Sequence, residues 1–325
     1  METTVQKILN YITKNNQASG RELTGYLGTI SPRAVRKQLK NLLDKKLINK
    51  TGRPPKVYYS LADKKFFSMP IQTNSEILRI IEERYLFISP SGEAKYGWEG
   101  FTLWCEKIKQ DPIKTAHEYI ETLKKYDKFQ KKDLINGIEK IKHTFDTVYL
   151  DKLFYLDFYS IERFGKTKLG QMLLYAKQSQ NKALIRKVVD EIQQKIKRVV
   201  REYKIDGVLF IPPTVKREVQ FMKELENGLH LSVKPLIVAK VKTEIAVPQK
   251  TLNKLEDRVE NAKRTIVVED TGSYKNILII DDAVGSGSTL NQTAAQIKRK
   301  GLCSGKVIGL AITGSFKGFD VISEV

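Results

Sequence analysis

Cysteine is nearly absent from the sequence, since only Cys105 and Cys303 occur and no CxxC pair is present. Neither a disulfide framework nor a cysteine-based zinc site can therefore form within one chain. The sequence also lacks any apolar run of about 18 residues, which a membrane-spanning helix needs. Its N-terminal stretch has no basic region followed by an apolar core, as a secretory signal would have. We therefore expect a cytoplasmic protein with reduced thiols and no membrane partner.

Histidine and acidic residues are scarce as well. Of the three histidines, His117 and His143 have no histidine or carboxylate partner at helical spacing, so we expect neither to bind a metal. The chain contains 57 Lys and Arg against 37 Asp and Glu, which gives a net charge of +20. Such an excess attracts polyanions through solvent at moderate salt. A nucleic acid or a phosphorylated ligand is therefore the expected partner.

The basic charge is concentrated in the two ends of the chain. Residues 1–65 hold 14 Lys and Arg against 4 Asp and Glu, residues 66–150 hold 13 of each, and residues 151–325 hold 30 against 20. The length of 325 residues, with 41% hydrophobic and 29% charged residues and no internal repeat, is typical of a multidomain globular protein. We predict three parts with these boundaries and an anion-binding module in the first and the third.

Three helices and a hairpin are predicted in residues 1–65. Each helix follows a threonine or serine that can cap it, and the third begins at Ser31 before Pro32. Strands are expected at 47–50 and 56–61, around a turn at 51–55 that contains glycine and two prolines. Apolar residues at helical spacing mark the three helices: Val5, Ile8, Leu9 and Ile12, then Leu23, Tyr26 and Leu27, then Val35, Leu39, Leu42 and Leu43.

The outer face of the third predicted helix is basic, which suits a helix in the major groove of DNA. Residues 1–65 resemble the winged helix-turn-helix family, an α+β fold, and the GRPPKVYYSL segment is typical of its wing. The resemblance implies that the third helix reads the major groove and that the wing touches the backbone or the minor groove. A solvated basic face, or a domain that contacts proteins, is the alternative. The residues that we expect to bind DNA are Arg33, Arg36, Lys37, Lys40, Arg53 and Lys56.

Residues 66–150 are predicted to form a mainly helical connecting segment. Apolar residues cluster at 77–81 and again between Ile120 and Ile141. Residues 97–105 include two tryptophans and a phenylalanine, and such a group is more often core than a ligand site. We expect no functional site in this segment.

Short apolar runs alternate with helical stretches from residue 205 onward. This alternation predicts an α/β fold with a mainly parallel sheet covered by helices. Ligands of such sheets bind at the carboxyl ends of the strands. The apolar runs are 208–211, 236–239, 265–268, 277–280 and 307–312, and the helical stretches include 219–225 and 289–300.

Residues 276–290 combine an apolar strand, two acids, a small-residue loop and the start of a helix. The loop offers backbone N–H groups and hydroxyls at a helix N-terminus, which can hold a phosphate. Asp281 and Asp282 can accept hydrogen bonds from vicinal sugar hydroxyls and can bind Mg²⁺ directly or through water. A phosphate and a diol one sugar apart indicate a ribose 5-phosphate. The loop consists of Gly285, Ser286, Gly287, Ser288 and Thr289.

Two common nucleotide-binding motifs are excluded by the same residues. A P-loop would need a lysine after Gly287, and a dinucleotide-binding turn would need a third glycine in place of Leu290. The string instead resembles the phosphoribosyl pyrophosphate (PRPP) signature of type I phosphoribosyltransferases. That signature has four apolar residues, two aspartates and a small-residue loop that ends in threonine.

Residues 155–325 further resemble the ComF-like branch of this family. Residues 210–217 are similar to its strand and pyrophosphate loop, and residues 158–187 with Lys177 to its lead-in helix. The cysteine-rich zinc ribbon that usually opens the family is absent, so no role of that ribbon is carried over. In the mobile hood of the family, four spaced residues match Gln249, Leu255, Arg258 and Asn261.

The resemblance implies a chemistry in which a nitrogen base displaces pyrophosphate from C1 of PRPP. Mg²⁺ together with Lys216, Arg217 and Arg258 would neutralise the leaving group. Asp281 and Asp282 would hold the ribose and the metal, and the loop from Gly285 to Thr289 would bind the 5-phosphate. Closure of the hood, residues 241–264, would exclude water.

Three functions remain open at this point. The first is a transcriptional regulator that binds DNA and senses PRPP or a nucleotide, as purine-repressor regulators with a similar domain arrangement do; we favour it because a DNA reader is hard to explain on a housekeeping transferase. The second is an active Mg²⁺-dependent phosphoribosyltransferase. The third is a nucleic-acid-docked effector, for instance in phage defence. The acceptor base and the DNA site leave no readable motif, and a homodimer is expected only because winged helices often bind palindromes.

Overall fold

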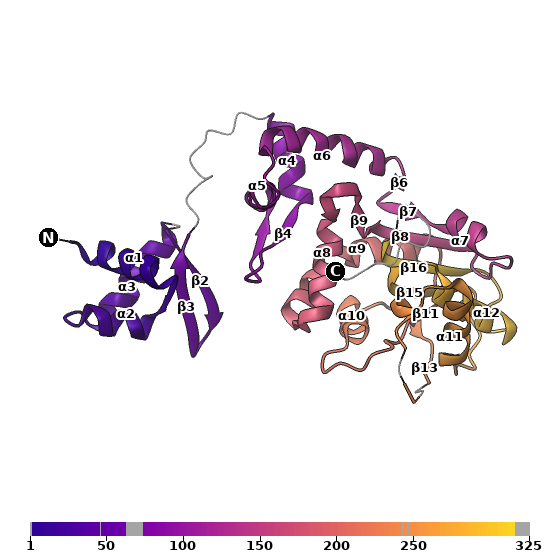
Figure 1. Cartoon of the computed structure of the whole chain (residues 1–325). Helices are drawn as coiled ribbons and strands as arrows, with labels where there is room; N and C mark the ends of the chain where they lie inside the picture. Colours follow the sequence, from indigo (N-terminus) through magenta and orange to yellow (C-terminus); the bar gives the residue numbers. More distant parts are fainter. Residues whose placement is uncertain (1, 46, 63–73, 242–243, 246, 316–325) are drawn as a thin grey trace. The chain divides into compact units, whose positions relative to one another are not determined.

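The computed structural model describes residues 2–45, 47–62, 74–241, 244–245 and 247–315. Contacts divide the chain into two compact units, which are described separately below (Figure 1). No helix of the described residues is long and apolar enough to cross a bilayer. The first unit is Met1–Thr73 with Ser89–Glu93, and the second is Asn74–Ile88 with Ala94–Val325.

The first unit contains the three expected helices. They are α1 (Thr4–Asn15), α2 (Gly20–Leu27) and α3 (Pro32–Asp44). Thr3 and Ser19 cap the first two helices through reciprocal capping boxes, and the Ser31 hydroxyl caps α3. These caps are local signals, and the predicted helices are confirmed.

One residue of the predicted apolar faces does not lie in the core. Tyr26 is 51% exposed, and its ring lies beside that of Tyr11 with 4.5 Å between centroids. Its spacing on α2 is helical, but its position falls at the margin of the buried face. The prediction that Tyr26 packs with Leu23 and Leu27 in the core is therefore wrong.

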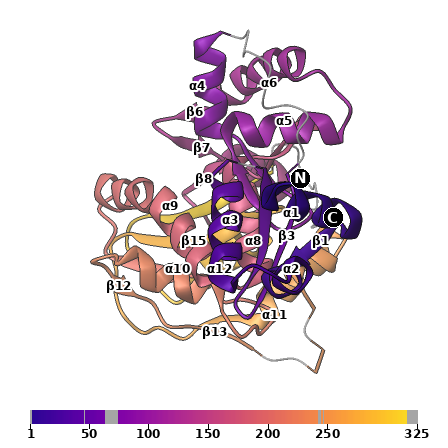
Figure 2. The ribbon, with the colours of Figure 1, turned by 90° about the vertical axis from the view of Figure 1, so that its left-hand side faces the viewer.

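A three-stranded antiparallel sheet completes the first unit. β2 (Ile48–Arg53) pairs with β3 (Lys56–Leu61), which also pairs with β1 (Gln17–Ser19). The predicted turn was too wide, because residues 51–53 still pair with β3. β1 was not predicted, since three residues between two helices carry no strand pattern of their own. In Figure 2 the three helices of this unit lie together beside β3.

The second unit is built on a seven-stranded sheet in the order β12-β11-β15-β16-β8-β7-β6. The first five strands in this order are parallel, and β7 and β6 are antiparallel additions. The expected α/β architecture with a mainly parallel sheet is confirmed. The strands are β6 (Gln130–Lys131), β7 (Leu134–Asn136), β8 (Lys152–Phe158), β11 (Gly207–Phe210), β12 (Lys234–Pro235), β15 (Ile277–Val284) and β16 (Val307–Gly314).

Helices cover both faces of this sheet (Figure 1). Alternation along β15 shows why, because Ile277 and Ile279 pack into one apolar core while Leu278 and Ile280 pack into the other. One core includes residues of α7 (Ile138–Thr144) and α12 (Ser288–Arg299), with α11 (Leu255–Thr265) packed on α12. The other includes α8 (Lys168–Ser179), α9 (Lys182–Glu202) and α10 (Phe221–Leu229).

The predicted lead-in helix at 158–187 is wrong. Phe158 ends strand β8, a short pair of strands follows, β9 (Ser160–Ile161) and β10 (Gly165–Lys166), and α8 and α9 are separate helices. Gln180 breaks them with φ 53°, and Asn181 caps α9. The apolar run at 152–158 was missed because it directly precedes helical periodicity.

The connecting segment is mainly helical, as predicted, with α4 (Ser75–Arg84), α5 (Gly97–Lys107) and α6 (Pro112–Asp127) ahead of α7. The aromatic string is core, since Phe101 is fully buried and its ring lies 5.0 Å from that of Tyr85. Two features were not predicted. The β4 (Leu86–Ile88) and β5 (Ala94–Tyr96) strands form a hairpin, and β6 and β7 extend the main sheet.

Candidate functional site

The small-residue loop after β15 leads into α12. Gly287 is the N-cap residue of this helix and has φ 83°, in the left-handed region that favours glycine. A Cβ atom at Gly287 would also collide with Cδ1 of Ile141 in α7. The hydroxyls of Ser286 and Ser288 share a hydrogen bond of 2.9 Å. The first N–H groups of α12 therefore lie at the carboxyl end of β15.

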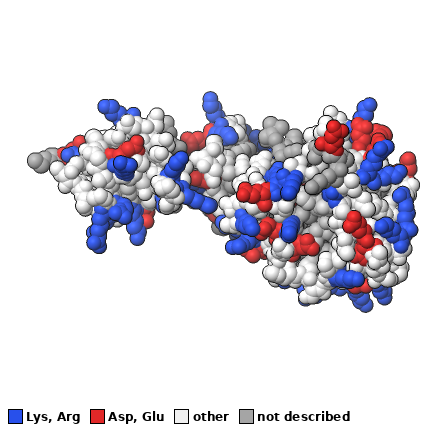
Figure 3. Space-filling view, turned by 90° about the horizontal axis from the view of Figure 1, so that it is seen from below, with Lys and Arg blue, Asp and Glu red and all other residues white. Residues whose placement is uncertain are grey.

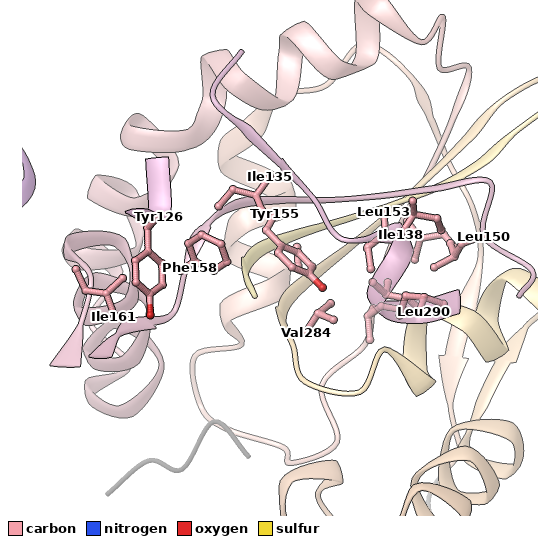
Figure 4. Packing of buried hydrophobic residues seen from close by; sticks show 14 of the residues in the cluster. Tyr126, Ile135, Ile138, Leu150, Leu153, Tyr155, Phe158, Ile161, Val284 and Leu290 are labelled. Carbon is pink, nitrogen blue, oxygen red and sulfur yellow. The ribbon is translucent and has the colours of Figure 1, made fainter. Parts of the chain in front are cut away.

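The connecting segment supports this loop from behind. Asn291, in the first turn of α12, accepts a hydrogen bond from the Tyr149 N–H at 2.8 Å and donates one to the Thr147 carbonyl at 3.0 Å. Figure 4 shows apolar residues of the connecting segment and β8 gathered around Leu290. A segment in which the sequence predicts no site thus fixes the position of the loop.

The two aspartates lie near the end of β15 and have different partners. Asp282 Oδ2 forms an ion pair of 2.6 Å with Nζ of Lys177, which comes from α8. Burial, and then the neighbouring charge of Asp282, raise the pKa of Asp281 to about 8. The charges of Lys177 and Lys240 act in the opposite direction on Asp281. One carboxylate of the pair is thus held by a lysine, and the other is partly buried.

The segment expected to be a hood forms a small substructure over residues 238–268. Its base is the antiparallel pair β13 (Val238–Lys240) and β14 (Ile266–Val268), and α11 follows the short helix η2 (Gln249–Thr251). Residues 242, 243 and 246 of the expected hood lie outside the described residues.

Hydrogen bonds hold the residues of the hood that the resemblance singles out. The Gln249 amide donates to the Arg258 carbonyl at 2.9 Å and to Asn261 Oδ1 at 3.2 Å. Arg258 is only 4% exposed, its Nε donates to the Leu252 carbonyl at 2.6 Å, and burial lowers the pKa of its guanidinium. The motif residues therefore build the inside of the hood.

A cavity of about 270 Å³ lies between the hood, the loop and the ends of β11 and β15. Most of the predicted site residues line it together. Lys216 is the exception, since it is exposed and does not belong to the lining. The predicted residues in the lining are Asp281, Asp282, Arg217, Arg258, Gly285, Ser286, Gly287, Ser288 and Thr289.

Two further cations, Lys177 and Lys240, line the same cavity. The family resemblance includes Lys177 only as part of a lead-in helix, and no sequence motif includes Lys240. Lys240 Nζ donates to Thr265 Oγ1 at 2.7 Å, and burial lowers the pKa of its ammonium. The apolar run at 236–239, directly before Lys240, predicts a strand there but does not assign a face to Lys240.

The carboxylates of Asp281 and Asp282 suit a magnesium ion only when a bound ligand supplies further oxygen donors. Among the residues that the structure describes, no group of three or more His, Cys, Asp and Glu side chains could hold a metal. Asp281 and Asp282 are two carboxylates, and Mg²⁺ commonly binds through one or two carboxylates, several waters and substrate phosphates. The aspartates therefore suit Mg²⁺ that arrives with a phosphorylated ligand.

In the first unit, the cations expected to bind DNA all lie at the surface. Arg33, Arg36, Lys37 and Lys40 are exposed on α3, and within residues 2–45 and 47–62 no salt bridge holds them. Arg53 and Lys56 are exposed and directly opposite each other at the end of the hairpin. Figure 3 shows groups of Lys and Arg on the surface of this unit. These side chains are available to an external polyanion.

No protein-family model matches the chain, and no curated protein matches it. The function must therefore be inferred from the residues and their geometry.

Proposed function

We propose that the second unit binds PRPP with a site of the type I phosphoribosyltransferase kind, of the ComF-like branch. The observation that carries this proposal is the single cavity that joins the acidic pair, the small-residue loop and the buried Arg258. The loop and the N-terminus of α12 would bind the 5-phosphate. Asp281 and Asp282 would accept hydrogen bonds from the ribose diol.

The charge in the cavity also favours such a ligand. Its lining includes four cations and two carboxylates, so an anion with several phosphates would be stabilised there. The cations are Lys177, Arg217, Lys240 and Arg258. Mg²⁺ bound with PRPP would neutralise part of the pyrophosphate charge. The two aspartates would thus bind the diol, and the cations and the loop of the same cavity would bind the phosphates.

We propose that the first unit is a winged helix-turn-helix domain that binds DNA, and that the whole chain is a PRPP-sensing transcriptional regulator. Support comes from the exposed cations of α3 and from the hairpin that follows it. If PRPP favours one arrangement of the two units, it changes DNA affinity, and DNA must change PRPP affinity by the same factor.

An active phosphoribosyltransferase is the second candidate, and the hood residues in the lining of the cavity favour it. The hood residues Gln249 and Arg258 line the cavity, so a bound sugar would be shielded from water. Asp281 and Asp282 would hold the ribose while a nitrogen nucleophile replaces pyrophosphate at C1. Lysine and arginine side chains would stabilise the charge of the departing pyrophosphate.

The test combines calorimetry with phosphorus NMR on the full chain with PRPP and Mg²⁺. We expect the wild type to bind PRPP and the Asp281→Asn, Asp282→Asn double variant to lose at least 100-fold in affinity. Pyrophosphate release that depends on an added small-metabolite extract would favour the enzyme. Binding without release, together with an effect of PRPP on DNA affinity, would favour the regulator. Normal PRPP binding by the double variant would refute the site.

A further inference from the structure

The cations that line the cavity come from different elements, so each would meet a different part of a bound PRPP molecule. Arg258 lies close to Gly285, because a Cβ atom added at Gly285 would be 3.5 Å from Nη1 of Arg258. Gly285 begins the loop that would bind the 5-phosphate. The guanidinium of Arg258 is therefore beside the first residue of the loop that would bind the 5-phosphate.

The two cations expected in the pyrophosphate loop differ in their access to the cavity. Lys216 is exposed and outside the cavity lining. Arg217 lines the cavity, but its Nη1 donates to the carbonyl oxygen of Lys177. Lys177 itself is bound to Asp282 at 2.6 Å and so orients that carboxylate. A further cation of the lining can therefore contribute to binding the pyrophosphate.

Lys240 has the required position. It pairs with Ile266 across the β13–β14 ribbon, and because directly opposite residues share a face, both side chains point to the cavity that they line. Asp281 lines the same cavity. Asp281 would hold a hydroxyl of the ribose diol, and C2 of that diol is bonded to C1, which carries the pyrophosphate. A cation that faces the same cavity as Asp281 can thus meet the leaving group.

We propose that Lys240 binds the pyrophosphate group of PRPP, whereas Arg258 binds its 5-phosphate. This assignment rests on the proposed PRPP site. One of the three N–H donors of Lys240 is used by Thr265, and two remain for phosphate oxygens. Thr265 ends α11 and so links the lysine to the same helix that carries Arg258. Each end of the ligand would then be bound by one cation of the hood.

The experiment compares two ligands that differ only in the pyrophosphate. PRPP and ribose 5-phosphate, each with Mg²⁺, are titrated into the wild type and into Lys240→Gln. Glutamine can keep a hydrogen bond to Thr265 but has no charge. We expect at least a 10-fold loss of PRPP affinity and less than a twofold change for ribose 5-phosphate. Lys240→Arg should recover most of the PRPP affinity, which a purely structural role of Lys240 would not explain.

Two further variants separate the possible failures. Lys216→Gln is the matched control and should bind both ligands as the wild type does, while Arg258→Lys should weaken both. Equal losses for both ligands in Lys240→Gln, or a selective loss of PRPP in Lys216→Gln, would overturn the assignment and leave the PRPP site intact. A wild type that fails to bind PRPP would refute the proposed function and this assignment with it. Circular dichroism confirms that each variant is folded.

Discussion

The two units present their cations in opposite ways. In the first unit the cations of α3 and of the hairpin are exposed at the surface. In the second unit Arg258 and Lys240 are desolvated within a cavity, and burial lowers the pKa of each. Exposed cations suit a long polyanion, whose binding depends steeply on salt. Enclosed cations suit a small ligand that carries several charges. Under the proposed function, the cations of the two units would therefore bind two different kinds of anion.

The largest effect is expected inside the second unit, at Gly287. Gly287→Ala places a Cβ in the left-handed region and against Ile141, so we expect the unfolding free energy of this unit to fall by about 3 kcal/mol. PRPP binding should be lost, because the loop must shift. Urea denaturation and calorimetry measure the two effects.

The matched control for that variant is Gly301→Ala. Gly301 also has a positive φ, 66°, but a Cβ there would meet no atom within 4 Å. We expect a loss of about 1 to 2 kcal/mol from backbone strain alone, with PRPP binding unchanged. Equal losses of stability and of binding in both variants would contradict the tight packing of the loop around Gly287. They would also weaken the contrast between the cavity of the second unit and the exposed cations of the first.

An intermediate effect is expected on the surface of the first unit. The double variant Arg36→Ala, Lys40→Ala should weaken DNA binding by about 10- to 100-fold and reduce the slope of log K against log salt by about 2. Its stability should stay as in the wild type, since both side chains are exposed. Fluorescence anisotropy at several salt concentrations gives both quantities.

The control for the DNA experiment uses exposed cations of α1. Lys7→Ala with Lys14→Ala removes the same charge from another helix, and we expect only a small loss that reflects net charge. An unchanged affinity in the Arg36→Ala, Lys40→Ala variant would rule out α3 as the DNA-reading helix. Equal losses of DNA affinity in the two double variants would indicate that the first unit attracts DNA only through its net charge.

The smallest effect concerns a carboxyl group outside the cavity. Burial raises the pKa of Asp157, at the end of β8, to about 6, although its hydrogen bonds to Thr167 and to the Phe158 N–H and the charges of Arg84 and Lys195 oppose this. Because the folded pKa is above the unfolded one, ionisation destabilises the fold as pH rises from about 4 to about 6.

Asp157→Asn removes that ionisation, so the variant should gain stability relative to the wild type across this pH window. We expect a gain on the order of 1 kcal/mol after allowance for solvent screening, which is about 2 to 4 °C in melting temperature. Thermal denaturation at pH 4, 5, 6 and 7 measures it. A constant difference between variant and wild type over this range would contradict the raised pKa.

Much of the local structure could be read from the sequence. Ser19 and Ser31 cap their helices, the continuous apolar run at 277–280 forms a strand with two buried faces, and the glycines of the loop take up a turn before α12. In each case the signal lies within a few residues of the feature that it determines. The acidic pair and the loop were found for the same reason, because β15 carries them in one continuous segment.

Other parts depended on residues far apart in the chain. β1, β6 and β7 have two or three residues each, too few for a periodic pattern, and they exist because a partner strand lies beside them. The positions of Lys177 and Lys240 in the cavity lining likewise depend on tertiary contacts. Lys177 pairs with Asp282, and Lys240 donates a hydrogen bond to Thr265.

By itself, therefore, the sequence determined the basic ends, the capped helices, the mainly parallel sheet and the small-residue loop before α12, since propensity, periodicity and glycine conformation act locally. Only the tertiary structure decided that the connecting segment supports that loop, that Lys216 lies outside the cavity and that Lys240 lies inside it. The physical reason is that burial and ion pairing depend on which distant segments of the chain pack together. The chemistry of a side chain alone does not specify that packing.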